Sequence, residues 1–499
     1  FHKAASDTFG NYNMGCNKFS GKKSNNKPWF NKECRKARKN FHLAKKNHNN
    51  CKSEENLSHL KSQSKNYKRV MDECIKNYRK SITEKITDVR TTNTKEYWKI
   101  LNSTCKDKKC AVDINNMFDY LRGINDCEND DEPNIEYSDF LSNAEIEMSD
   151  AILNSTIGDE EILEAVKKLK NNKAAGYDEV LNEHISATVS LFLPLYNKLF
   201  NIIFDNGFIP DEWLVGIVKP IYKNKGDPTH PENYRPITLL SCLGKLFTCI
   251  LSNRLEIYAS EIDVISESQA GFRKNYSTLD HIITLQFLSH TFMSMKKKLF
   301  CAFVDFKQAF DTVWRNGLWS KLIKNGINGK CFNYIKNMYM EVKSKISMNG
   351  LSSEFFSCNV GVRQGENLSP FLFSLYINDL EKFLIDKNII GLQSVTKPLE
   401  DELFMYFKLC ILFYADDTVI LAETPDDLQN ALNEFHLYCE QWKLTVNINK
   451  TKILVFSKGP MIKREFYFRN EIIENVKEFK YLGIVFSRSG SFRKAKTHL

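Results

Sequence analysis

No apolar run in this sequence is long enough to span a bilayer, and its first residues lack the pattern of a signal peptide. The fourteen cysteines are scattered, and the closest pairs, Cys105/Cys110 and Cys242/Cys249, do not have the spacing of a zinc site with a nearby histidine. These absences argue against a secreted, disulfide-bonded protein and against a structural zinc. We expect an intracellular protein with reduced thiols and no membrane partner.

Negative charge is scarce in the first part of the chain. Residues 1–110 contain 27 Lys and Arg against 10 Asp and Glu, although the net charge of the whole chain is only +9. A basic segment of this kind favours a polyanionic partner, here nucleic acid. The alternative is a solvated, charged helical surface without such a role, which is common in proteins.

The length of 499 residues allows two or three domains with a large core. Residues 1–28 are rich in Gly, Asn and Lys, and we expect a disordered segment or linker. Residues 29–124 form a basic segment with helical periodicity, and the acidic residues 125–150 form a linker at a domain boundary. Beyond them strands alternate with helices, which predicts an α+β domain.

Two helices of this second part have clear start signals. Asp159, Glu160 and Glu161 place acidic side chains in a first turn, where they suit the helix dipole. Thr424 and Pro425 provide an N-cap and a first helical residue. The second helix has an apolar stripe that predicts packing against a sheet.

Adjacent carboxylates lie between two apolar runs of strand length, because residues 411–421 read ILFYADDTVIL. This pattern predicts a β-hairpin with Asp416 and Asp417 at its tip. Residues 299–304 form another buried-type strand, which ends on Asp305. Three such carboxylates can converge on two divalent cations and support an in-line phosphoryl displacement. The simpler alternative is that the Asp pair only makes a turn.

Several motifs, in this order, resemble the reverse transcriptases of non-LTR (LINE-type) retrotransposons. They cover roughly residues 150–490 and are Lys173–Asp178 (KAAGYD), Asn233–Leu240 (NYRPITLL), Gln269–Arg273 (QAGFR), Phe303–Val313 (FVDFKQAFDTV), Gly361–Pro370 (GVRQGENLSP), Tyr414–Asp417 (YADD), Leu444–Lys452 (LTVNINKTK) and Phe479–Gly483 (FKYLG). Each motif alone is moderately specific, but an accidental match of all of them in this order is implausible.

The resemblance implies a right-hand polymerase fold of the α+β class. Residues 151–203 would extend the fingers, residues 204–487 would form fingers and palm, and residues 488–499 would begin a truncated thumb. Because the chain starts at Phe1 without Met, we expect a fragment of a longer element protein. The resemblance further implies an RNA-directed DNA polymerase that binds an RNA template, a DNA primer and dNTPs. Such a protein would be located in the nucleus and the cytoplasm. The oligomeric state is unknown from the sequence.

The resemblance also implies which residues hold metal ions and act in catalysis. Asp305 and Asp416 would bridge two Mg²⁺ ions, for which Mn²⁺ can substitute, and Asp417 would be an adjacent ligand or supporting acid. The backbone carbonyl of Phe306 would complete a coordination shell. Lys450 would be the general acid for the pyrophosphate leaving group, or a cation close to the phosphates.

The remaining implied residues contact the nucleotide: Phe310, Gln364, Gly365, Arg235 and Arg273. Phe310 would press against C2′ of the incoming sugar and exclude a 2′ hydroxyl. Gln364 would bond the sugar or base edge, and Gly365 would let the backbone approach the nucleotide. The guanidinium groups of Arg235 and Arg273 match triphosphate oxygens.

Two other protein classes stay open at this point. A viral-type RNA-dependent RNA polymerase shares the palm acids, but it usually has Gly before the Asp pair and no aromatic gate, whereas this chain has Ala415 and Phe310. A domesticated, catalytically silent palm that acts as an RNA-binding scaffold would be marked by lost acids. Asp305, Asp416 and Asp417 are all present.

Overall fold

The computed structural model describes residues 27, 29–92, 110–125, 151–389, 391–395, 406–409, 411–460 and 462–490. The chain divides into two compact units, with a boundary between Lys109 and Cys110. The expected linkers at 1–28 and 125–150, and the expected start of a thumb at 488–499, lie almost entirely outside the described residues. Each unit is therefore described by itself.

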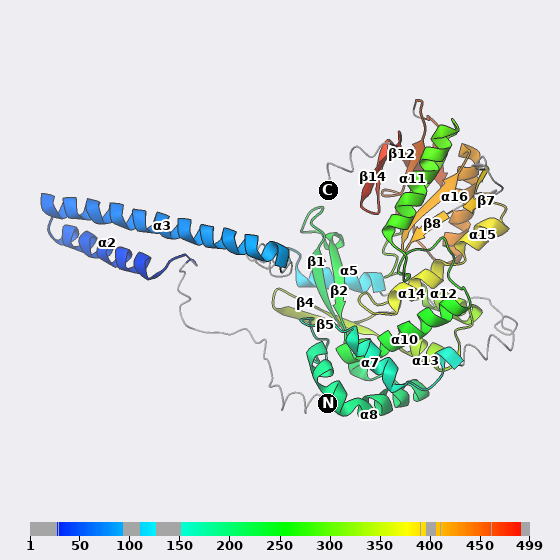
Figure 1. Ribbon diagram of the computed structural model, residues 1–499, viewed down its shortest axis with the longest axis horizontal. Coiled ribbons are helices and arrows are strands. Elements are labelled where there is room, and N and C mark those ends of the chain that lie inside the picture. The colour runs from blue at the N-terminus through cyan, green and yellow to red at the C-terminus, as the bar shows by residue number, and fades with distance from the viewer. Residues whose placement is uncertain are drawn as a thin grey trace. The chain divides into compact units, whose positions relative to one another are not determined.

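The N-terminal unit is a helical hairpin of α2 (Lys32–Asn50) and α3 (Glu54–Thr92) (Figure 1). The Asn31 side chain caps α2 by accepting a hydrogen bond from the Cys34 backbone nitrogen at 3.1 Å. Small buried residues, Ala37 and Ala44 among them, let the two helices approach closely. Phe41 stacks on Tyr67 across the pair, with ring centroids 5.8 Å apart. The Lys and Arg side chains of α2 point into solvent.

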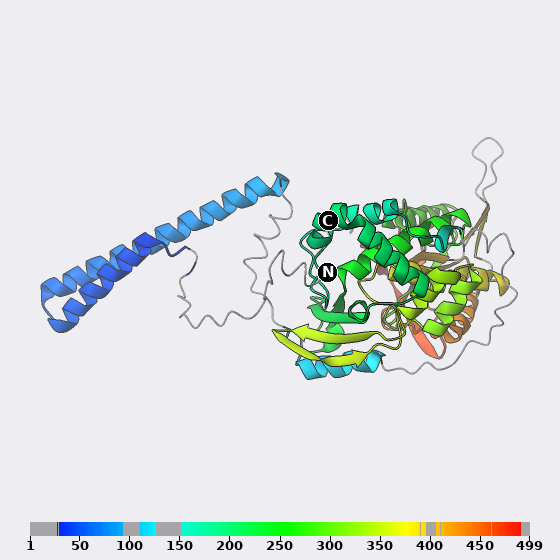
Figure 2. The ribbon, with the colours of Figure 1, turned by 90° about the horizontal axis from the view of Figure 1, so that it is seen from below.

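The second unit contains a four-stranded sheet of order β2-β1-β4-β5, which we call the fingers sheet after the fingers that the resemblance implies. Its strands are β1 (Val215–Tyr222), β2 (Tyr234–Leu239), β4 (Lys343–Met348) and β5 (Leu351–Ser357), and the short 3-10 helix η1 (Pro231–Asn233) precedes β2. Helix α5 (Ile114–Asn125) packs on one face of this sheet, and Figure 2 shows it along β4 and β5. Met117 and Leu121 of α5 are buried there. The basic segment expected at 29–124 therefore differs from the structure, in which residues 110–125 belong to the second unit.

Helices that lie before and between these strands in the chain pack into the main core of this unit. They are α7 (Asp159–Lys167), α8 (Asn182–Asn206), α9 (Asp211–Leu214), α10 (Cys242–Glu261), α12 (Arg315–Lys324) and α13 (Gly329–Asn337). The start expected for α7 is confirmed, and the Glu161 side chain accepts a hydrogen bond from the Gly158 nitrogen at 2.9 Å. Glu161 also pairs with the buried guanidinium of Arg254 at 2.7 Å, which ties α7 to α10.

Among the described helices, α8 alone is long and apolar enough, by length and composition, to cross a membrane. Polar residues interrupt the apolar run of α8, so the sequence alone predicts no such span. One face of α8 buries Ile185, Phe200 and Phe204 in the main core, and 28% of the apolar window is buried. The helix bends near Pro194, where Phe192 has non-helical dihedral angles.

A second sheet has six strands in the order β11-β12-β10-β3-β9-β8, and we call it the palm sheet after the palm that the resemblance implies. Its strands are β3 (Leu299–Val304), β8 (Ile411–Tyr414), β9 (Asp417–Ala422), β10 (Lys452–Phe456), β11 (Phe466–Phe468) and β12 (Glu471–Val476). The other described elements are α11 (Thr278–Ser294), α14 (Ser369–Ile377), α15 (Leu380–Asp386), α16 (Pro425–Gln441) and the hairpins β6 (Leu392–Val395)–β7 (Tyr406–Leu409) and β13 (Glu478–Tyr481)–β14 (Ile484–Ser487).

Alternate residues of a palm strand point to opposite faces of the sheet, and other elements cover both faces. Ala302 and Val304 of β3 pack into the main core with α16, while Cys301 and Phe303 pack into a second core with α11 and β13–β14. The start expected for α16 is confirmed: Thr424 Oγ1 accepts a hydrogen bond from the Asp427 nitrogen at 3.1 Å. The mixed α+β class is as expected from the sequence.

Candidate active site

The acidic hairpin forms as the sequence predicts, except that only Asp416 lies in its turn, while Asp417 is the first residue of β9. Strands β8 and β9 are antiparallel with Tyr414 opposite Asp417, so Ala415 and Asp416 make a two-residue turn. Ala415 has a positive φ of 58°, which an Ala adopts only at some cost. Strand β3 is the other neighbour of β9, with Val304 opposite Thr418. Asp305, the residue after Val304, is therefore brought beside the turn of the hairpin.

The three carboxylates act on one another electrostatically. Burial raises the pKa of Asp416, the charge of Asp305 raises it further, and Lys450 opposes the shift. Burial also raises the pKa of Asp417, to about 6, and the charges of Asp416 and Asp305 act in the same direction. A cation placed among these acids would relieve that repulsion.

Lys450 lies at the same place, with Nζ 3.2 Å from Asp305 Oδ2. The segment that carries it is fixed to the end of β3, because the Asn447 nitrogen donates to the Asp305 carbonyl at 2.7 Å and Thr451 Oγ1 accepts from the Asp305 nitrogen. Phe306 forms a bridge with Val446 that does not use the Phe306 carbonyl. The sequence-predicted residues Asp305, Phe306 and Lys450 therefore adjoin one another.

The donor set suits a hard divalent cation. Apart from the ion pair with Lys450, the buried Asp305 Oδ2 has no hydrogen-bond partner among the described residues, so a metal ion would have to share it with Lys450 or displace that lysine. The side chains are not drawn into a closed ligand set, however. Within the described residues, no group of three or more His, Cys, Asp or Glu side chains is arranged to hold a metal ion. Occupation of the site by a metal ion would require the carboxylates to turn toward one another.

A half-buried aromatic ring lies beyond the acids. Phe310 stacks on Phe373 of α14, with centroids 4.6 Å apart and planes at 25°, and meets the edge of Phe272 at 6.2 Å. The Val362 nitrogen donates to the Phe310 carbonyl at 2.8 Å, which joins this segment to the loop that carries Gln364. Two packed rings thus fix the orientation of Phe310.

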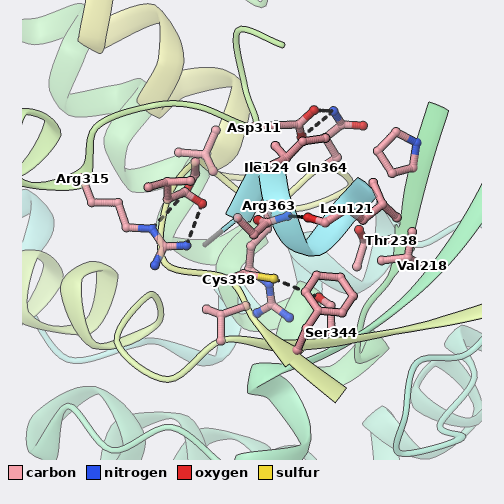
Figure 3. A pocket seen from close by; sticks show the side chains of 17 residues that line it. Leu121, Ile124, Val218, Thr238, Asp311, Arg315, Ser344, Cys358, Arg363 and Gln364 are labelled. Atoms are coloured by element: carbon pink, nitrogen blue, oxygen red, sulfur yellow. Dashed lines mark hydrogen bonds between the residues drawn. The ribbon is translucent and has the colours of Figure 1, made fainter. Parts of the chain in front are cut away.

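Gln364 is held by an acid that the sequence analysis did not select. Its Nε2 donates to both carboxylate oxygens of Asp311, at 2.8 and 2.9 Å, as Figure 3 shows. Burial raises the pKa of Asp311 to about 6, although Gln364 and the charge of Lys223 oppose the shift. Because Nε2 faces Asp311, the amide oxygen of Gln364 remains for a ligand. Asp311 was within a quoted motif, but only the fold shows its partner.

Gly365 approaches the strand β2 closely. It has a φ of 100°, and a Cβ there would lie 2.9 Å from the Thr238 carbonyl oxygen. This combination of dihedral angle and space favours glycine at that position.

The cations of the fingers divide into two groups. Arg235 is exposed on β2, and its charge and that of Lys450 add to burial in lowering the pKa of Lys223. These three cations therefore share one region beside the acids, and Lys223 was missed because a lone lysine has no sequence signature. Arg273 instead donates to the Ser266 and Gln269 carbonyls and lies over the Tyr276 ring at 4.3 Å. The structure thus engages Arg273 within its own loop.

The sequence of this unit matches a known family of enzymes. A family model described as reverse transcriptase (RNA-dependent DNA polymerase) matches residues 221–486, which is more than half of the chain. The chain belongs to the reverse transcriptase family. Enzymes of this family generally use divalent metal ions. The match includes Asp305, Phe310, Gln364 and the Asp416–Asp417 pair.

Curated relatives place the chain among the reverse transcriptases of non-LTR retrotransposons, as the motifs predicted. The probable RNA-directed DNA polymerase from transposon BS of Drosophila melanogaster is 28% identical over 367 residues, which are 72% of this chain and 38% of that protein. The RNA-directed DNA polymerase from mobile element jockey of the same organism is 28% identical over 346 residues, which are 68% of this chain and 36% of that protein. A Pol polyprotein from the type-1 element R2 of Popillia japonica is 27% identical over 301 residues, or 57% and 39%. The chain spans less than two fifths of these relatives.

Proposed function

We propose that this chain is the polymerase part of a non-LTR retrotransposon protein and extends a primer 3′ hydroxyl with dNTPs by copying RNA. The observation that carries the proposal is the convergence of Asp305 with the Asp416–Asp417 turn and Lys450, next to Phe310 and Gln364. A carboxylate cluster alone fits many phosphoryl transferases. The rigid aromatic ring beside it favours one that makes DNA.

In this proposal each side chain has a defined task. Asp305 and Asp416 would hold two divalent cations, Mg²⁺ or Mn²⁺, with support from Asp417 and the Phe306 carbonyl. When bound, such cations activate the attacking oxygen and neutralise charge on the α-phosphate. Lys450, which lies beside Asp305, would donate a proton to the departing pyrophosphate or stabilise its negative charge.

The nucleotide would lie between the palm and the fingers. Phe310 would exclude a 2′ hydroxyl by contact with C2′, and the amide oxygen of Gln364 would accept a hydrogen bond from the sugar. Arg235 and Lys223 carry positive charge in the same region and would contact the triphosphate. Arg273 would have to leave its internal bonds to do so, which makes it the weaker candidate.

Primer extension on matched RNA and DNA templates tests the proposal. We expect dNTP-dependent elongation on the RNA template and much weaker use of rNTPs. Extension with rNTPs as the preferred substrates would overturn the DNA-making assignment. Nucleic-acid binding without any extension would favour the silent scaffold instead.

The Asp311–Gln364 pair predicts a pH-dependent affinity for the nucleotide. With a pKa of about 6, Asp311 is a carboxylate above that pH and a carboxylic acid below it. Protonation weakens the hold on Gln364, so KM for dNTP should rise as the pH falls through about 6. The variant Asp311→Asn should show a KM raised roughly tenfold at neutral pH and should lose this pH dependence.

Steady-state KM between pH 5 and 8 measures this effect, separately from kcat. The separation matters because Asp417 also titrates near pH 6, and its protonation should act on kcat and on metal binding. A wild-type KM that stays constant across this range would contradict the assigned task of Asp311.

The basic hairpin of α2 and α3 is proposed to bind the phosphates of RNA. Replacing three exposed lysines of α2, Lys36, Lys39 and Lys46, by Gln should flatten the slope of log Kd against log salt by up to about 0.7 for each lost phosphate contact. The affinities for RNAs of unrelated sequence should fall by similar factors. Filter binding between about 50 and 200 mM salt measures the slope.

The matched control replaces three exposed lysines of the second unit, Lys336, Lys382 and Lys387, by Gln. It makes the same change in net charge, but it should leave the slope nearly unchanged. Equal effects of the two triple variants would show that only the total charge of the chain matters. An unchanged slope in the α2 variant would mean that the hairpin is a solvated surface.

A further inference from the structure

The turn that carries Asp416 is held from outside the hairpin. Strand β8 is the edge strand of the palm sheet. Its outer edge pairs with a loop that precedes α11. The Phe413 nitrogen donates to the Ser268 carbonyl at 2.8 Å, and the Ala270 nitrogen donates to the Phe413 carbonyl at 3.0 Å. The loop Ser266–Gly271 thus acts as a short extra strand beside the catalytic hairpin.

The side chain of Gln269 reaches the turn itself. Its Oε1 accepts hydrogen bonds from the Ala415 nitrogen at 3.1 Å and from the Gly271 nitrogen at 2.8 Å. Gln269 is only 1% exposed, and its Nε2 has no partner among the described residues. The acceptor oxygen is therefore the part of this side chain that the fold uses.

The turn needs such support because of its backbone. Ala415 has a φ of 58°, a left-handed conformation that is unfavourable for an L-residue with a side chain. Gly271 packs directly on it, and a Cβ at Gly271 would overlap the Ala415 backbone nitrogen. The hydrogen bond to Gln269 satisfies a buried N–H group and favours the strained conformation at the same time.

The loop is itself anchored to the corner between α14 and α15. Glu381 accepts hydrogen bonds from the hydroxyl groups of Ser266 and Ser268, at 2.6 and 2.7 Å, and Asn378 accepts one from the Ser266 nitrogen at 2.9 Å. A continuous set of hydrogen bonds therefore runs from this corner through the loop to Ala415. A rigid support of this kind can fix the position of the next residue, Asp416.

We propose that Gln269 is a positioning residue, which fixes the turn so that Asp416 faces Asp305. It touches neither metal ion nor nucleotide in this proposal. The catalytic consequence rests on the proposed polymerase function, whereas the structural part does not. The loop that carries Gln269 lies between α10 and α11 and belongs to no strand of the palm sheet. A segment outside the sheet would therefore control the geometry of the palm acids.

Replacing Gln269 by Leu removes the acceptor and keeps a buried side chain of similar size. We expect the Ala415 amide to exchange its hydrogen about tenfold faster, because it loses a protected partner. The value of kcat for primer extension should fall about 100-fold, as expected for a catalytic group displaced by about 1 Å. KM for dNTP should change less than about threefold, and the Mg²⁺ concentration for half-maximal activity should rise.

Two further variants separate positioning from damage to the fold. Gln269→Glu keeps an acceptor oxygen, so it should restore the slow exchange of the Ala415 amide. Thr418→Val is the matched control in β9, since the Thr418 hydroxyl is buried without a hydrogen-bond partner in the described part of the chain. This variant should leave both exchange and extension within about twofold of wild type.

Hydrogen exchange of a peptide over residues 411–417, measured together with extension, decides the matter. Unchanged Ala415 exchange in Gln269→Leu would overturn the proposal, as would fast exchange with an unchanged kcat and Mg²⁺ requirement. If wild type shows no extension but the Ala415 amide exchanges faster in Gln269→Leu, the polymerase proposal fails while the support of the turn by Gln269 stands.

Discussion

Replacing Asp416 by Asn is expected to lower primer extension about 1,000-fold or more while RNA binding stays within about twofold. Asn keeps the shape of the side chain but removes the charge that would hold a cation. Asp416 lies in the two-residue turn between β8 and β9, next to Asp305, where a neutral amide cannot compensate metal charge. Single-turnover extension gives the rate, and filter binding gives the affinity for RNA.

The same substitution should not destabilise the fold. Burial raises the pKa of Asp416, which means that the ionised form is the less favoured one in the folded state. Above that pKa, a neutral Asn removes repulsion from Asp305 and Asp417, so the unfolding midpoint should stay constant or rise when metal is absent. Asp386→Asn, at an exposed position at the end of α15, is the matched control and should change neither activity nor stability.

Parallel loss of extension, RNA binding and thermal stability in Asp416→Asn would assign this position a folding role. Retained extension would remove Asp416 from the catalytic centre. Either result would contradict the mechanism proposed above.

Replacing Phe310 by Val is expected to raise rNTP use relative to dNTP use about 100-fold. The aromatic ring is fixed by its stack on Phe373 and by the edge of Phe272, so it cannot move aside for a 2′ hydroxyl. A shorter side chain removes the steric conflict, and much of the dNTP activity should survive. The measurement is the ratio of kcat/KM for dNTP to that for rNTP in wild type and variant.

Two comparisons distinguish a sugar gate from a packing residue. Phe287→Val makes the same change on the exposed face of α11, where Phe287 is 51% exposed, and should leave the ratio unchanged. The unfolding midpoint of Phe310→Val shows how much stacking on Phe373 stabilises the fold. A constant ratio in Phe310→Val would make Phe310 a core residue and would remove the best local support for the choice of DNA.

Local patterns in the sequence were sufficient to predict the acidic hairpin and the starts of α7 and α16. The two apolar runs around Asp416 and Asp417 predicted a β-hairpin with both acids at its tip, and the structure places Asp416 in the turn and Asp417 at the start of β9. Thr424 predicted the start of α16 because a capping interaction involves residues only three positions apart. The family motifs then related Asp305 to this hairpin across more than one hundred residues.

Contacts between distant segments could not be read in the same way. Gln269 bonds Ala415, which lies 146 residues away, and Asp311 bonds Gln364, which lies 53 residues away. Neither pair has a periodic or local signature, because each forms only after strands and loops are placed by the core. The boundary near residue 110 was missed for a similar reason: α5 is short, and only its packing on the fingers sheet assigns it to the second unit.

The most direct test of the central claim is the addition of a single nucleotide to a DNA primer annealed to an RNA template of defined sequence. Each of the four dNTPs is offered alone to the wild-type chain, with Mg²⁺ and with chelator. The proposed polymerase should add only the dNTP complementary to the template base, and only when the divalent cation is present. Addition without regard to the template, or equal addition in chelator, would contradict the assignment of Asp305, Asp416 and Asp417 as the centre of an RNA-directed DNA polymerase.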